Sequence, residues 1–301
     1  MEKINYKAMR ANAEQMEWVL NKHWENPEER QKARERFNII FVAIDENENI
    51  IGRLIIEEKK VPPPLNGTDW WINNLFTLPE FRRQGIASAM LKETIKHAEQ
   101  SNIRHLQGSA SPTLQASMFW FNHNFCVSKY GQKSDDGNYP HMIFYRIDRN
   151  VKENQKDQNG CHIIKADKEQ INYIFDEYIV NINPEYFKDK RDDIFGYAAV
   201  DENKKMIGFI TSWADDLGLP LSGVQWWTRI FVFPEMRRRG IGSVLLKEMI
   251  KFTKESNVTQ LLCAYQNDEA SGFWYNNNFD MFYWSAVGVN NTLITAGLRI
   301  L

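Results

Sequence analysis

A stretch of twenty-seven residues occurs twice in this chain, about half a chain apart, and it limits the possible folds more than any other feature. The first copy, Phe76–Asn102, reads FTLPEFRRQGIASAMLKETIKHAEQSN, and the second, Phe231–Asn257, reads FVFPEMRRRGIGSVLLKEMIKFTKESN, with fifteen identical positions. Each copy has the pattern of a strand, a Pro-Glu step, paired arginines, a glycine turn and an amphipathic helix. The repeat therefore predicts two domains of the same topology.

The length and composition fit this division. The 301 residues are long for one compact domain and sufficient for two of about 150 residues. A hydrophobic content of 43% with 25% charged residues is typical of globular proteins. Between the two copies, Asp148–Gly160 contains a single aliphatic residue, Val151, and has the composition of a linker. We therefore place the domains at residues 1–150 and 161–301, with residues 151–160 as the linker.

The remaining elements also occur in the same order in both halves. Residues 39–56 and 195–212 each predict a hairpin, with two apolar strands around an Asp-Glu-Asn turn. A tryptophan pair then precedes the strand of the repeat, and a short strand and a second helix follow the repeat. A helical stretch broken by Asn-Pro comes before each hairpin, at residues 11–36 and 168–190. Mixed strands with helices between them predict two α/β (α+β) domains.

The charge balance and the cysteine content argue against several classes of function. A formal net charge of -2 gives no general attraction to nucleic acid, and no apolar run of about eighteen residues could span a membrane. The first ten residues lack the apolar core of a signal peptide, and three widely separated cysteines suit a reducing cytoplasm. The six histidines do not have metal-ligand spacing. We expect a cytoplasmic monomer or homodimer with no metal, nucleic-acid or membrane partner.

The glycine turn of the repeat carries the clearest chemical signal. In the second copy, residues 237–243 read RRRGIGS. A glycine lets the chain turn sharply from strand to helix, and the first helical amides then face outwards at the positive end of the helix dipole. With arginines beside them, these amides predict a site for a diphosphate. The alternative for a single copy is a helix start with a solvated basic cluster, but two copies in the same context favour the anion site.

Two known phosphate-binding turns do not match. A P-loop requires a Gly-Lys-Ser/Thr sequence after the turn, and neither copy has one. A dinucleotide fingerprint requires a third glycine three residues further on, where the two copies have Met90 and Leu245.

These motifs make the chain resemble the GCN5-related N-acetyltransferase (GNAT) superfamily, and its tandem members in particular. The family pattern V-x-P-x-x-R/Q-x-x-G-x-G/A is matched by residues 232–242 and, with Thr77 in place of the valine, by residues 77–87. A second family pattern, N-x-x-A-x-x-(L/F)-Y-x-x-x-G-F, is matched in part by residues 267–279 and 113–125. The resemblance covers nearly all of both halves. It implies two tandem GNAT domains, each with a mixed, splayed central sheet flanked by helices.

The resemblance also implies a coenzyme and a reaction. The pyrophosphate of acetyl-CoA would bind the amides of residues 239–243, and its pantetheine would run along the strand Phe231–Phe233 where two strands splay apart. A primary amine on a small molecule or peptide would attack the thioester directly in a ternary complex, while a backbone N–H near Val232 holds the oxyanion. The implied coenzyme-binding residues are Phe231, Val232, Phe233, Arg237, Arg238, Arg239, Gly240, Ile241, Gly242, Ser243, Asn267, Phe273 and Trp274, with Leu78, Arg82, Arg83, Gln84, Gly85, Ile86, Ala87 and Ser88 in the first half.

The chain departs from the family pattern at the tyrosine that would protonate the leaving thiolate. Both halves have tryptophan at that position, Trp120 and Trp274, and an indole N–H is not a usable acid. Tyr265 and Tyr275 are the candidate catalytic residues that could replace the missing tyrosine. For the base, Asp215 and Asp216 lie where acceptors approach in this family, with a solvated loop pair as the alternative reading.

The two halves also differ from each other. The second half keeps Gly242 and Asn267, whereas the first has Ala87, which the family pattern allows, and Thr113, which it does not. We therefore expect the second half to be catalytic and the first to be degenerate. Because both halves have lost the tyrosine, the alternative function is a non-catalytic protein that binds CoA or a partner.

Overall fold

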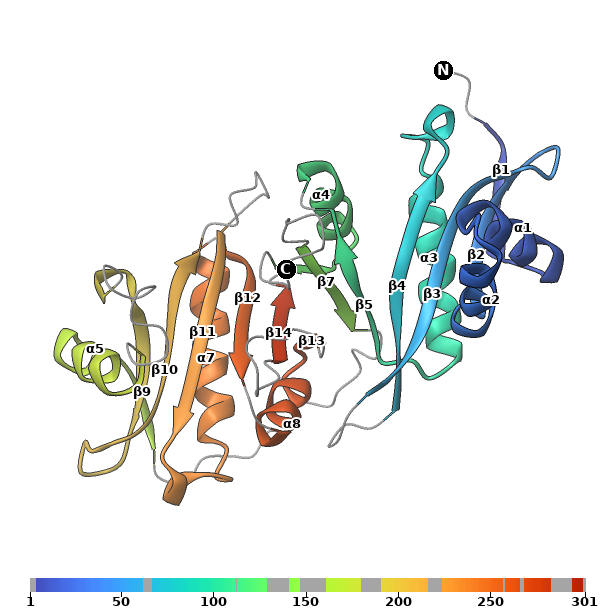
Figure 1. Ribbon diagram of the computed structural model, residues 1–301. Coiled ribbons are helices and arrows are strands. Elements are labelled where there is room, and N and C mark those ends of the chain that lie inside the picture. Colours follow the sequence, from blue (N-terminus) through green and yellow to red (C-terminus); the bar gives the residue numbers. More distant parts are fainter. Residues whose placement is uncertain are drawn as a thin grey trace.

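The computed structural model describes residues 4–61, 67–111, 113–128, 141–146, 161–179, 191–215, 224–256, 258–265, 268–282 and 294–299. These residues form two mixed sheets, one from each half of the chain (Figure 1). The predicted fold class is confirmed, because each half is an α+β unit with helices flanking a central sheet. The predicted linker, residues 151–160, lies outside the described residues, so the exact domain boundaries stay a prediction.

The first sheet has seven strands in the order β1-β2-β3-β4-β5-β7-β6. Neighbouring strands are antiparallel except β4 and β5, which are parallel. The predicted hairpin turn between β2 and β3 is fixed by the Asp45 carboxylate, which accepts from the N–H groups of Asn47 and Asn49. The strands are β1 (Tyr6–Arg10), β2 (Ile39–Asp45), β3 (Ile50–Val61), β4 (Gly67–Thr77), β5 (His105–Ala110), β6 (Cys126–Ser128) and β7 (His141–Arg146).

The second sheet repeats this topology, in the order β13-β14-β12-β11-β10-β9-β8. Its parallel pair is β11 and β12, which correspond to β4 and β5. The equivalent hairpin turn is held by Asp201, which accepts from the N–H groups of Asn203 and Lys205. The strands are β8 (His162–Lys165), β9 (Phe195–Val200), β10 (Met206–Asp215), β11 (Val224–Val232), β12 (Val258–Tyr265), β13 (Asp280–Phe282) and β14 (Ile294–Arg299).

The predicted helices are present, and their ends follow from local capping. Asn26 begins the second helix: its side chain accepts from Glu28 N–H and Pro27 occupies the first turn, which explains the predicted break. Of the predicted stretch 168–190, the structure describes residues 168–179. The helices are α1 (Ala13–His23), α2 (Pro27–Arg36), α3 (Ile86–Gln100), α4 (Leu114–Asn122), α5 (Lys168–Ile174), which continues into the π-helical turn η2 (Phe175–Ile179), α7 (Ile241–Glu255) and α8 (Asp268–Asn276).

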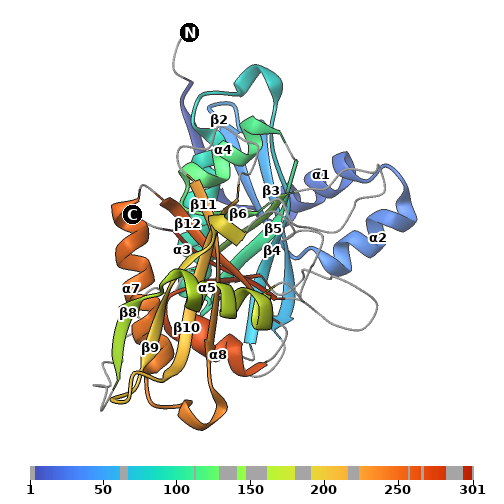
Figure 2. The same cartoon turned by 90° about the vertical axis from the view of Figure 1, so that its left-hand side faces the viewer.

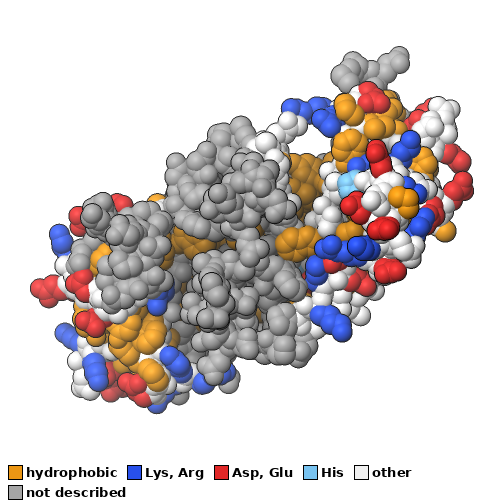
Figure 3. Space-filling view, in the orientation of Figure 1, with side chains coloured by type: hydrophobic (Ala, Val, Ile, Leu, Met, Phe, Trp, Pro, Cys, Tyr) orange, Lys and Arg blue, Asp and Glu red, His pale blue; other side chains and the backbone are white. Residues whose placement is uncertain are grey.

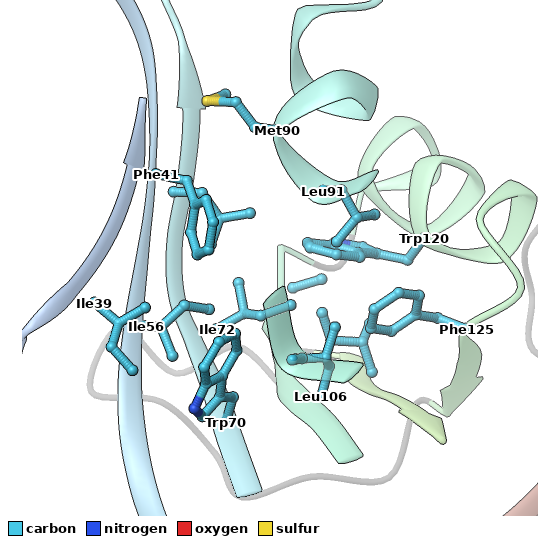
Figure 4. Packing of buried hydrophobic residues seen from close by; sticks show 14 of the residues in the cluster. Ile39, Phe41, Ile56, Trp70, Ile72, Met90, Leu91, Leu106, Trp120 and Phe125 are labelled. Carbon is cyan, nitrogen blue, oxygen red and sulfur yellow. The ribbon is translucent and has the colours of Figure 1, made fainter. Parts of the chain in front are cut away.

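Helices cover both faces of each sheet (Figures 1 and 2). In the first half, α3 and α4 pack on one face, around a buried cluster that includes Phe41, Leu91 and Trp120 (Figure 4), while α1 and α2 pack on the other. In the second half, α7 and α8 cover one face, and α5 with η2 covers the opposite face. Because each sheet is covered on both faces, each half has its own core, as the length predicted.

The two halves share an interface in which a side chain completes an edge strand. The side-chain amide of Gln260, on β12, donates to the carbonyl of Val127 at 2.7 Å and accepts from its N–H at 3.2 Å. In this way it supplies the partner that strand β6 would otherwise lack. Beside it, the Cys126 thiol donates to Asp280 at 3.6 Å.

Close packing supports the same interface. A Cβ added at Gly297, on β14, would lie 2.9 Å from the Phe144 ring and 3.0 Å from Cys126 Sγ, so the backbone of the second half packs directly against β6 and β7. The cluster under α5 also includes Cys126, Met142 and Phe144 from the first half. The two halves therefore pack through a dense, hydrogen-bonded contact.

Candidate functional site

The central sheet opens at the same place in both halves. Within the described residues, β4 pairs with β5 from Trp70 to Ile72, and β11 pairs with β12 from Val224 to Trp227. Beyond these points β4 continues to Thr77 paired with β3, and β11 continues to the end of its ladder with β10. Parallel strands that separate leave a crevice at their carboxyl ends, where ligands of α/β sheets bind. The splayed sheet predicted for each half is confirmed.

The glycine turn that follows each open strand has the same backbone conformation in both copies. Gly85 and Gly240 are left-handed, with φ of 85° and 83°, and Arg83 and Arg238 both have φ of 64°. The glycines begin α3 and α7, and no side chain of a described residue caps either helix. The first-turn amides therefore have no side-chain cap among the described residues, and their role in binding an anion stays a prediction.

Among these amides, one in the second copy has an internal partner. Ser243 N–H bonds to the carbonyl of Gly240 at 3.0 Å. The N–H groups of Ile241 and Gly242 precede it in the first turn, and neither has a partner among the described residues. We use the term cradle for these turns, residues 82–88 in the first half and 237–243 in the second.

The arginines of the cradle stabilise the conformation of the turn and also give it a positive charge. Arg82 Nε donates to the Thr77 carbonyl at 3.1 Å, and Arg237 Nε donates to the Val232 carbonyl at 3.0 Å. Each of these hydrogen bonds ties the turn to the end of the open strand. Arg239 Nη2 donates to the Glu235 carbonyl at 3.3 Å. All of these arginines are exposed, so the positive charge predicted beside the amides is present.

A bulge distinguishes the open strand of the first half. Ile55 pairs with Asn74 and Ile56 pairs with Ile72, so Asn73 is an extra residue in β4, next to the last residue paired with β5. The corresponding β10–β11 ladder is unbroken from Gly208 to Asp215. A bulge leaves a backbone group unpaired and is common near active sites. The sequence analysis missed it, although seven residues separate Trp71 from Pro79 and six separate Trp227 from Pro234.

The residues that distinguished the two halves in sequence have roles in packing and capping. A Cβ on Gly242 would lie 3.1 Å from the Phe273 ring, so glycine lets α7 approach α8 closely. Thr113 begins α4, and its hydroxyl accepts from Ala116 N–H at 3.3 Å. Asn267 lies outside the described residues. These packing and capping roles do not require a coenzyme, so the choice of the second half as catalytic stays a prediction.

The tryptophans at the family's tyrosine position are core residues. Trp120 and Trp274 are buried, and Figure 4 shows the Trp120 indole packed near Leu91 and Phe125 in the first core. They fill space between helix and sheet.

The candidate tyrosines lie in different places. The Tyr275 ring centre is 5.8 Å from the His105 ring and 5.8 Å from the Arg104 guanidinium, both on the first half, so Tyr275 takes part in the interface. Tyr265 is the last residue of β12 and pairs with Ile294. Their catalytic roles stay predictions. Asp215 ends β10, and Asp216 lies outside the described residues.

The sequence analysis also missed two half-buried arginines on the sheet faces covered by α1 and α2 and by α5. Arg53 lies on β3, and Arg229 lies on β11 between Trp227 and Phe231. Burial lowers the pKa of each guanidinium from its usual value. Strand alternation could have found Arg229, because it places a charge on the same face as two large aromatic residues.

The two cradles and the two openings define a class of protein in which a splayed α/β sheet leads into a glycine turn and an uncapped helix start, here present twice. The acetyltransferase (GNAT) family matches residues 7–123 and 154–279, and the chain belongs to that family. The predicted tandem arrangement is thereby confirmed. No curated protein matches the chain.

Solved structures similar to this chain each correspond to about half of it. An N-acetyltransferase from Staphylococcus aureus Mu50 is 20% identical and covers 48% of this chain and 100% of its own, with a TM-score of 0.36. NAA60 from Arabidopsis thaliana, in complex with a bisubstrate analogue, is 15% identical over 48% of this chain and 99% of its own, with a TM-score of 0.39. An Escherichia coli GNAT family N-acetyltransferase in complex with CoA is 13% identical and covers 49% of this chain and 84% of its own, with a TM-score of 0.38.

The described surface carries charges of both signs side by side over each end of the molecule (Figure 3). Within the described residues, no group of three or more His, Cys, Asp or Glu side chains is placed to hold a metal ion. In the same part of the chain, none of the helices has the length and apolar character needed to cross a bilayer.

Proposed function

We propose that this protein is an acetyl-CoA-dependent N-acetyltransferase that moves an acetyl group to a primary amine on a small molecule or peptide. The observation that carries this proposal is the pair of uncapped helix starts, each at the end of a strand that has separated from its neighbour. Membership of the acetyltransferase family supports the coenzyme class. The cradle supplies what a diphosphate requires, namely outward amides, a helix dipole and exposed arginines.

In this proposal the second half carries the reaction. The diphosphate would bind the amides of residues 239–243, and the pantetheine would lie along Phe231–Phe233, on the side of β11 that has separated from β12. An unpaired backbone N–H near Val232 would hold the thioester oxygen as it becomes negative. The bulge at Asn73 is the one observation that favours the first half, and it makes a comparison of the two cradles necessary.

The reaction requires few groups from the protein. The nitrogen lone pair of the amine attacks the carbonyl carbon, the carbon–sulfur bond breaks, and CoA leaves as a thiolate. The amine loses one proton to water or a nearby base. Trp274 occupies the position of the usual acid and is buried, so water would protonate the thiolate, which is a tolerable leaving group near neutral pH.

A non-catalytic CoA-binding or partner-binding protein is the second candidate. The replacement of the tyrosine by a core tryptophan in both halves favours it. We keep a cytoplasmic location as part of the proposal. The three cysteines, all among the described residues, form no disulfide bond.

Two measurements on the full chain test the proposal. Calorimetric titration with CoA gives affinity and stoichiometry, and a thiol assay with acetyl-CoA and a panel of primary amines gives turnover. We expect CoA binding together with amine-dependent release of CoA. Binding without turnover across the panel would favour the non-catalytic protein, and the absence of binding would refute both candidates.

A further inference from the structure

Arg229 lies in an unusual position for a charged side chain. It alternates along β11 with Trp227 and Phe231, which both pack with the buried cluster under α5, so Arg229 is on the same face of the sheet. Ile230, between them, packs with the opposite core. Arg229 therefore points to the face covered by α5 and η2, where Tyr178 lies 5.0 Å from the Phe231 ring.

This guanidinium has no hydrogen bond or ion pair with any residue that the structure describes. A half-buried charge without a partner is unfavourable, and proteins usually pair such a group with a carboxylate or with hydrogen-bond acceptors. Burial alone lowers the pKa of Arg229. Its five N–H donors can therefore bind an acceptor that the described residues do not supply.

The Thr211 hydroxyl is a second polar group on this face of the sheet. Thr211, on β10, is the direct cross-strand partner of Arg229, and the side chains of such a pair share a face. Thr211 is 0% exposed, and its hydroxyl has no hydrogen-bond partner within the part of the chain that the structure describes. Phe209 and Trp213 lie on either side of Thr211 along the same face. A guanidinium and a hydroxyl, neither with a partner among the described residues, thus lie on paired residues of neighbouring strands and on the same face of the sheet, among aromatic side chains.

The first half provides an internal control for this arrangement. At the place of the Thr211–Arg229 pair it has Ile55 paired with Asn74, and Ile55 is part of the core under α1 and α2. The half-buried arginine of the first half, Arg53, has partners for its guanidinium. Arg53 Nε donates to Asn74 Oδ1 at 3.2 Å, Arg53 Nη2 donates to His23 Nδ1 at 3.0 Å, and the guanidinium lies 4.6 Å from the Phe76 ring.

We propose that Arg229 and Thr211 form an anion subsite for the acceptor, so that the substrate of the second half is a small amine that also carries a carboxylate. The inference rests on the proposed function for the identity of the ligand as an acceptor. A guanidinium binds a carboxylate through two parallel hydrogen bonds, and the hydroxyl donates a third.

The position of Arg229 limits the size of the acceptor. Arg229 stands two residues before Phe231, where the proposed coenzyme strand begins, about 7 Å along the strand. It also lies just beyond Trp227, the last residue that pairs with β12. A carboxylate at this point and an amine at the thioester can belong to one short molecule, so the structure favours amino-acid-like acceptors over long polyamines.

The first test compares the free acid and the amide of each of the twenty common amino acids as acceptors, with CoA release as the readout. We expect the acids to exceed their amides by at least about tenfold in kcat/KM, chiefly through KM, because a charged hydrogen-bonded pair is lost in the amide. R229M should remove this preference and T211V should reduce it, while R53M, which replaces the half-buried arginine of the other half, should keep it. Equal rates with acids and amides, or a preference that survives R229M, would overturn the proposal.

The second test does not depend on turnover. With CoA in excess, so that the cradles are filled, the full chain is heated in the presence of acetate or of the neutral analogue acetamide. We expect acetate to stabilise the wild type more than acetamide does, and R229M to show no difference between them. An equal response of wild type and R229M overturns the anion subsite. A response that depends on Arg229, in a protein that transfers no acetyl group, would leave the subsite in place and refute the proposed function.

Discussion

The two cradles of this protein are almost the same, whereas the sheet faces beside them are not. In both, the glycine φ is close to 84°, the preceding arginine has φ of 64°, and another arginine ties the turn to the end of the open strand. Beside the first cradle, Arg53, His23 and Asn74 satisfy one another. Beside the second, the Arg229 guanidinium and the Thr211 hydroxyl have no partner among the described residues. The comparison indicates that the cradle was kept in both halves while the sheet face beside it diverged.

The largest expected effect comes from blocking one cradle at a time. Gly240→Val places a β-branched residue at a left-handed position and removes the turn that presents the amides. We expect turnover to fall about 100-fold or more, because a misplaced coenzyme cannot react. The matched variant Gly85→Val should stay within about twofold of wild type. Steady-state CoA release measures both, and the reverse result would assign the chemistry to the first half, with its bulge at Asn73.

A second prediction concerns the contact between the halves. Gly297→Val would bring a Cβ to 2.6 Å from Leu262 Cδ2 and 2.9 Å from the Phe144 ring. We expect a loss of about 2 to 3 kcal/mol in the free energy of unfolding, typical of overpacking in a dense core. Urea denaturation followed by tryptophan fluorescence measures it. Gly272→Ala, in α8, is the control: outside its own stretch of helix the new Cβ would have no described atom within 4 Å, so the change should be neutral or slightly stabilising.

The third prediction compares how replacement of Arg229 and of Arg53 changes the stability of the protein. R229M replaces a half-buried guanidinium that has no described partner, and we expect the protein to gain about 1 kcal/mol of stability. R53M removes two hydrogen bonds and should cost about 1 kcal/mol. Thermal unfolding of the pair measures both effects. A loss of stability of equal size in the two variants would show that Arg229 is structurally engaged.

The smallest effect is a pH dependence in the first half. Burial and the neighbouring Arg53 lower the pKa of His23 below its usual 6.5. The folded protein therefore resists the proton that the unfolded chain takes up, so stability is full above about pH 6.5 and falls as the pH drops below it. H23Q should flatten this part of the stability profile, measured between pH 5 and pH 8 by chemical denaturation. An unchanged profile would show that His23 does not titrate differently in the two states.

Much of the fold follows from local sequence, and much of the site does not. The repeat predicted both cradles because a glycine turn and a helix period are short-range signals, and Asp45 and Asp201 fixed the hairpin turns in the same way. The strand before the first cradle begins at Gly67 and includes the tryptophan pair that we expected to precede it. These features need few distant contacts.

The missed features depend on residues far apart in the chain. The Gln260–Val127 hydrogen bonds join strands of different halves, so no local pattern could predict them. A partner for Arg229 could come from any element packed around it, so the sequence near Arg229 does not show whether it has one. Thr211 lies beside Arg229 only because β10 pairs with β11. The only local sign of the bulge at Asn73 is one more residue between the tryptophan pair and Pro79 than in the second half. The strand register shows that this residue forms a bulge.

The most direct test of the account is a crystal structure of the full chain with CoA. We expect the pyrophosphate to lie against the N–H groups of Ile241 and Gly242, with the pantetheine beside Phe231–Phe233 and the carboxylate of a co-crystallised amino acid at Arg229. A coenzyme bound elsewhere, with both cradles empty, would contradict it.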